Sequence, residues 1–141
     1  MIRVVAAVIV RDGKIFVCQR RKDDSFPLKW EFPGGKVESG EEETHALVRE
    51  LREELGVKAK IIRELERVEH HYANNEHTAR GHQRKSFAIA FYLADIGAQV
   101  PQNFAFEKFK WELPGDLRSN DFLEANGALV RKIAEGKITL E

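Results

Sequence analysis

The apolar residues of this chain fall in short runs that follow two different periods. Residues 4–10 are all Val, Ala or Ile, a pattern typical of a strand that is buried on both faces. Residues 41–55 instead repeat leucine at positions 47, 51 and 55, which is helical spacing. The pattern predicts strands at residues 4–10, 15–19, 57–69, 85–94 and 106–113, a short extended piece at 30–32, and helices at 41–55 and 121–135.

Turn and capping residues set the boundaries of these elements. Gly56 stands where a helix C-cap belongs, Asp121 is the predicted N-cap of the last helix, and Gly136 ends that helix. Residues 21–29 and 70–84 are polar, and both are predicted loops. The order strand, strand, helix, strands, helix favours an α/β fold with a mixed sheet and helices packed on it.

Length and composition narrow the classes of protein to consider. The chain has 141 residues, so a single domain over residues 1–141 is expected. Its 23 basic and 23 acidic residues give zero net charge, which argues against a protein that coats nucleic acid. The single cysteine, Cys18, excludes an internal disulfide and is expected to be buried in its strand. No apolar run approaches the roughly 20 residues of a membrane-spanning helix and no signal-peptide pattern is present, so the cytoplasm is the expected location.

The predicted helix at 41–55 carries the most informative cluster of charges. Glu50, Glu53 and Glu54 are spaced i, i+3 and i+4, so their carboxylates share one helix face and repel one another. A divalent cation would reverse the sign of that repulsion, and carboxylate oxygens suit Mg²⁺ or Mn²⁺. The alternative is a solvated helix face with salt bridges to Arg49 and Arg52.

Two glycines and the helix together form a longer motif. Gly34 and Gly35 allow the backbone to approach a ligand closely. The motif consists of Gly35, five residues, Glu41, seven residues, Arg49-Glu50-Leu51, one residue, Glu53-Glu54, one residue, and Gly56-Val57. It resembles the signature of the Nudix hydrolases, with every defining position filled. Residues 5–20 and 30–38 resemble the MutT branch, which includes 8-oxo-dGTP and CTP pyrophosphohydrolases, whereas residues 70–100 resemble it only weakly.

The resemblance implies a fold and a metal-dependent chemistry. Family members are α/β/α sandwiches with a mixed central sheet, in which divalent metal helps water to attack a phosphoanhydride. The positions that match metal ligands are Glu50, Glu53, Glu54 and the Gly34 carbonyl. The resemblance makes Glu53 the candidate that activates the water and Arg49 the residue that orients the helix carboxylates, so the implied catalytic set is Glu53, Arg49, Glu50 and Glu54.

The resemblance also suggests how a substrate is held. Arg20 matches a phosphate-contacting arginine, and Glu31, Phe32 and Pro33 match the stretch between nucleotide pocket and metal loop. Asn126 resembles an asparagine that reads a purine edge, and an amide offers both a donor and an acceptor for that purpose. The alternative for Asn126 is a polar residue on the exposed side of the last helix.

One feature fits the resemblance less well. The family commonly has a further glutamate six residues before a tryptophan, which here is Ala105 before Trp111, whereas Glu107 is four residues before it. Glu107 is therefore a candidate ligand only if the loop brings it to the metal.

Several histidines and basic residues gather in the predicted loop at 70–84. A zinc site is conceivable there, but an exposed hairpin is the simpler interpretation because no cysteine or carboxylate spacing supports zinc. The histidines are His70, His71, His77 and His82. Arg80, Arg84 and Lys85 could instead meet substrate phosphates.

The sequence thus favours an Mg²⁺-dependent nucleoside triphosphate pyrophosphohydrolase that releases a nucleoside monophosphate and pyrophosphate. Asn126 favours 8-oxo-dGTP or a related modified nucleotide as substrate. One alternative is CTP or a modified pyrimidine triphosphate, and another is a non-catalytic nucleotide-binding module. No stable nucleic-acid or membrane partner is expected, and the oligomeric state is open between monomer and homodimer.

Overall fold

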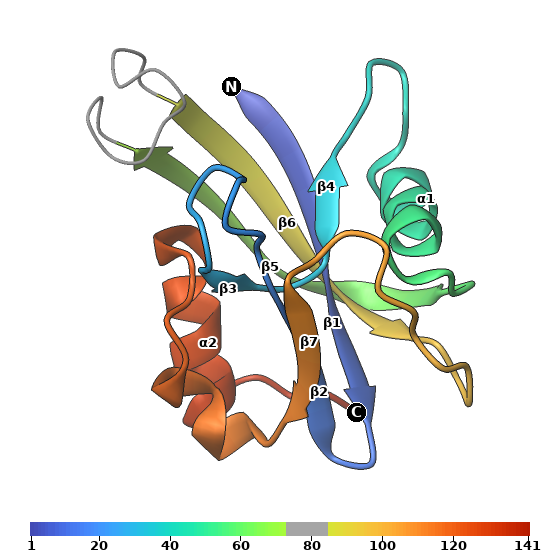
Figure 1. The fold of residues 1–141 in the computed structure, drawn as a ribbon, viewed down its shortest axis with the longest axis vertical. Coiled ribbons are helices and arrows are strands. Elements are labelled where there is room, and N and C mark those ends of the chain that lie inside the picture. The colour runs from blue at the N-terminus through green and yellow to red at the C-terminus, as the bar shows by residue number, and fades with distance from the viewer. Residues whose placement is uncertain (73–84) are drawn as a thin grey trace.

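A computed structural model describes residues 1–72 and 85–141 of the chain (Figure 1). Its strands are β1 (Ile2–Arg11), β2 (Lys14–Gln19), β3 (Trp30–Glu31), β4 (Gly34–Lys36), β5 (Lys60–Tyr72), β6 (Lys85–Asp95) and β7 (Lys108–Glu112). Its helices are α1 (Glu43–Leu55) and α2 (Gly127–Ala134), with 3₁₀ segments η1 (Pro114–Ser119) and η2 (Glu124–Asn126). Among the described residues, no helix is long and apolar enough to cross a membrane.

The strands form a mixed sheet in the order β3-β2-β1-β6-β5. The β1–β6 pair is parallel, whereas β5 with β6 and β1 with β2 are antiparallel. Two strands lie off this path, since β4 pairs with β1 and β7 pairs with β2. The predicted α/β architecture with a mixed sheet is confirmed.

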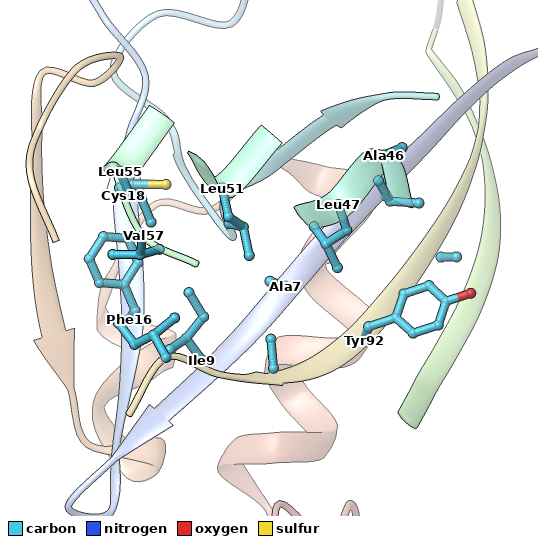
Figure 2. Close-up of a cluster of buried hydrophobic side chains, with 14 of the residues drawn as sticks. Ala7, Ile9, Phe16, Cys18, Ala46, Leu47, Leu51, Leu55, Val57 and Tyr92 are labelled. Carbon is cyan, nitrogen blue, oxygen red and sulfur yellow. The ribbon is translucent and has the colours of Figure 1, made fainter. Parts of the chain in front are cut away.

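Strand β1 explains the doubly buried apolar run, because its side chains alternate between two cores. Ala7 and Ile9 pack with the leucines of α1 on one face of the sheet (Figure 2). Ala6 and Val8 belong to a second core on the other face, which includes apolar residues of α2. The sheet therefore lies between α1 and α2, and the predicted burial of Cys18 is confirmed.

Strand β4 was missing from the sequence prediction. Its three residues pair with β1 in the register Val5 opposite Gly35 and Ala6 opposite Gly34. Two glycines and a lysine carry no hydrophobic period, so only the pairing with β1 makes this segment a strand. Its position beside α1 is what brings the glycines to the helix carboxylates (Figure 1).

Two further boundaries differ from the prediction. Strand β5 begins at Lys60 and continues to Tyr72, so His70 and His71 lie in a strand and not in a loop. The last α-helix begins at Gly127, after the η2 turn, and Asp121 does not cap it. The Asp121 carboxylate instead accepts a hydrogen bond from Lys29 at 2.8 Å, which ties the chain before η2 to the end of the 21–29 loop.

The start of α1 is fastened to the sheet by Glu43. Its carboxylate accepts two hydrogen bonds from Arg67, at 2.7 and 2.9 Å, and one from the Tyr92 hydroxyl at 2.8 Å. The side chain is only 17% exposed, and hydrogen bonding to Arg67 is the main cause that lowers the pKa of Glu43 to about 2. A carboxylate with a lowered pKa stabilises the fold above its unfolded pKa of about 4.3, and this contribution is lost as the pH falls toward 2.

We expect Glu43→Gln to lower the free energy of unfolding by about 1–2 kcal/mol at pH 7, because hydrogen bonds to a charged group are weakened. The difference from the wild type should shrink as the pH falls from 4 to 2. Urea denaturation across this range measures both effects. The matched control is Glu42→Gln at an exposed position with no side-chain capping bond; an equal loss in both variants would contradict the role of Glu43.

Candidate active site

The glycines of β4 lie directly against the carboxylates of α1. The Gly34 N–H donates a hydrogen bond to Oε1 of Glu54 at 3.1 Å. A Cβ on Gly35 would stand 2.4 Å from Cδ of Glu50, and a Cβ on Gly34 would stand 2.0 Å from the carbonyl oxygen of Val5. A side chain on Gly34 would therefore clash with the backbone of β1, whereas one on Gly35 would displace the Glu50 carboxylate.

Arg49 links most of the acidic groups at this surface. Its Nε and Nη2 donate to the two oxygens of Glu41 at 2.8 and 2.9 Å. Its Nη1 donates to Glu50 at 3.0 Å and to Glu53 at 3.4 Å, while Nη2 also bonds the Lys36 carbonyl at 3.1 Å. Hydrogen bonding from Arg49 is the main cause that lowers the pKa of Glu41 to about 2. The motif contains Glu41 at a fixed spacing, but only the structure shows that both of its carboxylate oxygens bind Arg49.

The three helix carboxylates differ sharply in their surroundings. Burial is the main cause that raises the pKa of Glu54 to about 9, and the neighbouring charges of Glu50 and Glu31 raise it further. Burial also raises the pKa of Glu50, whereas the side chain of Glu53 is 58% exposed. The site therefore contains a buried carboxyl group, Glu54, that is crowded by neighbouring negative charges, next to Glu53, which water can reach.

The carboxylate set fits a divalent cation by its chemistry. Within residues 1–72 and 85–141, no three His, Cys, Asp or Glu side chains are arranged as a ready-made metal cage. Arg49 engages Glu50 and Glu53, and the Gly34 N–H engages Glu54. The raised pKa of Glu54 nevertheless marks a place where a cation would offset repulsion, and the donors are hard oxygens of the kind that Mg²⁺ prefers.

A cavity of about 420 Å³ is lined by Glu54, alone among the three helix carboxylates, and by residues of the second core. Apolar walls from β1 and β6, such as Val4 and Ile89, enclose it. Six of the residues predicted from the sequence line it: Arg20, Glu31, Phe32, Gly34, Glu54 and Asn126. Pro33, also a predicted substrate-binding residue, does not line the cavity. It is buried, and its carbonyl accepts a hydrogen bond from the Ala7 N–H at 2.8 Å. The volume and the few polar groups in an apolar lining are typical of a small-molecule site.

Asn126 is only 5% exposed, so the alternative of an exposed helix position was wrong. Its Oδ1 accepts a hydrogen bond from the Phe32 N–H at 3.4 Å. A backbone N–H requires an acceptor, which fixes the oxygen toward Phe32 and leaves the two N–H donors for other partners. Among the described residues these donors have none, and Asn126 lines the cavity.

Arg20 and Glu31 form a second polar pair in the cavity wall. Arg20 donates to Glu31 at 3.1 Å and to the carbonyl and hydroxyl oxygens of Ser25 at 2.6 and 2.8 Å. It also pairs with Asp24 at 3.1 Å, so its guanidinium holds the 21–29 loop against β3. Burial raises the pKa of Glu31 to about 7, although the charge of Arg20 opposes this.

Comparison with known proteins decides the family. A family model for the NUDIX domain matches residues 1–133. The chain belongs to this family. It is a Nudix hydrolase, as the motif at residues 35–57 predicted.

Individual relatives carry different names. The chain is 57% identical over 61 residues to the CTP pyrophosphohydrolase of Escherichia coli K12, a match that covers 43% of this chain and 45% of that protein. It is 38% identical over 130 residues to the 8-oxo-dGTP diphosphatase of Buchnera aphidicola subsp. Schizaphis graminum, a match that covers 92% of this chain and 91% of that protein. The solution structure of the Nudix hydrolase MutT from methicillin-resistant Staphylococcus aureus 252 superposes with a TM-score of 0.72, at 32% identity and 96% coverage of both chains.

Not every candidate residue lies in the Nudix cavity. Glu107 lines a separate, more open pocket together with Arg21 and Lys22. Ala105, at the position where the family commonly has a glutamate, lines the main cavity instead. The backbone N–H of Glu107 bonds the Gln19 carbonyl at 2.9 Å, which fixes this arrangement beside β2.

The histidine-rich segment is described only in part. His71 shares a hydrogen bond with Ser86 at 2.7 Å, and Nε2 of His70 lies 3.9 Å from Glu124. Neither arrangement resembles a zinc site, which needs several convergent ligands. The candidates His77, Arg80, His82 and Arg84 and the side chain of Lys85 lie outside the described residues.

We expect Gly35→Ala to lower kcat about 10- to 100-fold with little change in Tm. The added Cβ would displace the Glu50 carboxylate, because β4 is held by its pairing with β1, and small misplacements of catalytic groups have effects of this size. Steady-state kinetics and a thermal melt measure the two quantities. Gly115→Ala is the control, since its Cβ would meet nothing within 4 Å; an unimpaired Gly35→Ala enzyme would contradict the placement of Glu50.

Proposed function

We propose that this Nudix hydrolase converts a nucleoside triphosphate to a nucleoside monophosphate and pyrophosphate, with Mg²⁺ as cofactor and Mn²⁺ as a substitute. The observation that carries the proposal is a cavity whose lining combines two kinds of polar group. Gly34 and the neighbouring carboxyl groups of Glu54 and Glu31 belong to the lining, and so does the amide of Asn126. One nucleotide can therefore present its phosphates to the carboxylates and its base to Asn126.

In this proposal Glu50, Glu53, Glu54 and the Gly34 carbonyl hold the metal. When bound, the divalent ion neutralises polyphosphate charge and makes a water molecule more acidic. Glu107 is left outside the proposed set because it lines the second pocket.

The chain's own groups then have distinct tasks. Glu53 accepts a proton from the attacking water, for which its exposure suits it, and Arg49 orients Glu50 and Glu53 through its hydrogen bonds. Attack on the β-phosphorus forms a new P–O bond and breaks the bond to the bridging oxygen, which leaves with the nucleoside monophosphate. The apolar cavity walls keep other water away from the base end.

We propose 8-oxo-dGTP or a related modified nucleotide as the preferred substrate, because the N–H donors of Asn126 match an acceptor on an oxidised purine. The name of the Buchnera relative agrees with this choice. The second candidate is CTP or a modified pyrimidine triphosphate, which Glu31 favours because a cavity carboxylate accepts hydrogen bonds from an amino group. The Escherichia coli relative agrees with that alternative.

We propose that residues 1–141 form one Nudix domain of a cytoplasmic enzyme that acts on free nucleotides. Zero net charge supports the lack of a stable nucleic-acid partner. A non-catalytic binding module is less favoured, because the helix carboxylates are complete and Arg49 holds them in order.

The test is a pyrophosphate-release assay on ordinary, oxidised and methylated nucleoside triphosphates, ranked by kcat/KM. Mg²⁺ or Mn²⁺ should support turnover and EDTA should abolish it. A preference for 8-oxo-dGTP supports the proposal. A preference for CTP contradicts the proposed substrate but leaves the proposed reaction in place. Hydrolysis that resists EDTA contradicts the metal-dependent mechanism, and binding without turnover in the presence of metal favours the binding module.

A further inference from the structure

Tyr72, the last residue of β5, touches the segment that carries Asn126. Its hydroxyl oxygen accepts a hydrogen bond from the backbone N–H of Ala125 at 3.3 Å. Ala125 directly precedes Asn126 in the η2 turn, and all three residues line the cavity. The Tyr72 hydroxyl thus holds the backbone next to the Asn126 amide in the cavity wall.

The ring of Tyr72 is itself held from several sides. It lies 4.6 Å from the ring of Phe26 in the 21–29 loop and 4.4 Å from the ring of His70, measured between centroids. Phe87 of β6 contacts it edge-on at 5.7 Å, and the residue as a whole is only 5% exposed. These contacts restrict the movement of the ring and thereby of its hydroxyl.

The η2 turn is held at its start also by the Leu123 N–H, which donates to the Trp30 carbonyl at 2.9 Å. It is three residues long, and its N-cap residue Leu123 has no side chain that can cap it. The first N–H groups of a helical turn need outside acceptors, and the Tyr72 hydroxyl supplies the one for Ala125. The Asn126 side chain is then fixed at a second point by the Phe32 N–H at 3.4 Å.

We propose that Tyr72 is a positioning residue for base selection, which acts through Ala125 to set the orientation of the Asn126 amide. The proposal rests on the proposed function insofar as Asn126 reads the base. The positioning of the Asn126 amide in the free protein does not depend on that function, because the hydrogen bond between Tyr72 and Ala125 exists without a substrate.

The decisive variant is Tyr72→Phe, which keeps the ring and removes the single oxygen atom. Its matched control is Tyr92→Phe, whose hydroxyl bonds Glu43 at the start of α1 and lies outside the cavity lining. In the free protein, the ¹H–¹⁵N side-chain resonances of Asn126 should shift in Tyr72→Phe and stay in place in Tyr92→Phe. Unshifted resonances in Tyr72→Phe would overturn the proposal.

Kinetics then link the position of the amide to selection. We expect Tyr72→Phe to reduce the ratio of kcat/KM for the preferred modified nucleotide to kcat/KM for its unmodified counterpart about five- to tenfold. The change should come mainly through KM, because the chemical step is untouched. Tyr92→Phe should leave the ratio unchanged. An undiminished ratio in Tyr72→Phe would overturn the link between Tyr72 and base selection.

A double variant separates positioning from direct contact. If Tyr72 acts through Asn126, Tyr72→Phe should have no further effect on the ratio in an Asn126→Ala background. A further loss there would show that Tyr72 contacts the substrate itself and would overturn the proposal. If Asn126→Ala alone leaves the ratio unchanged, the assigned role of Asn126 fails, whereas the resonance shift still tests the positioning by Tyr72.

Discussion

Replacing Glu53 with glutamine is expected to lower kcat by about 10²- to 10⁴-fold, the usual effect of removing a general base. A glutamine has nearly the same shape but cannot accept the proton of the attacking water. The fold should persist, since the Glu53 side chain is 58% exposed and its only recorded partner among the described residues is Arg49, at 3.4 Å. Initial rates at saturating nucleotide and Mg²⁺, with a thermal melt of the same sample, measure both quantities.

The control for this variant is Glu42→Gln, the same chemical change at the start of the same helix but away from the carboxylate cluster. It should retain nearly full activity. If Glu53→Gln also kept its kcat, the base would have to be sought elsewhere, and the buried Glu54 would be the next candidate because it lines the cavity.

Asn126→Asp is expected to lower kcat/KM for 8-oxo-dGTP about 10²-fold and to change the order of preferred nucleotides. The aspartate can still accept the hydrogen bond from the Phe32 N–H, so the local fold is kept. It loses both N–H donors, and a site that is built to bond a polar group discriminates strongly when its partner is lost. Bases that present a hydrogen-bond donor where the oxidised purine presents an acceptor, such as cytosine with its amino group, should gain relative to the oxidised purine.

The comparison variant is Asn126→Ala, which removes the acceptor for Phe32 as well as the donors. It should lose discrimination without gaining a new preference. The measurement is kcat/KM for 8-oxo-dGTP, dGTP and CTP with each enzyme. An equal loss on all three nucleotides in both variants would mean that Asn126 supports the cavity but does not read the base.

The chemistry of α1 could be predicted from the sequence because it depends on local spacing. Three carboxylates at i, i+3 and i+4 must share a face once the segment is helical, and Leu47, Leu51 and Leu55 made that helix clear. The apolar run of β1 likewise indicated a strand between two cores. The family followed from the same segment, because its motif is long and its spacing is helical.

The tertiary structure decided which distant residues meet. The Phe32 N–H and the Asn126 amide are 94 positions apart, and Tyr72 and Ala125 are 53 apart. No local period encodes such contacts, since they depend on how η2 packs against β3 and β5. For the same reason β4 escaped prediction, Asn126 proved buried, and Glu107 was placed in a second pocket. The sequence by itself thus determined the carboxylate face and the family, while long-range packing alone decided the shape of the cavity and the polar groups that line it.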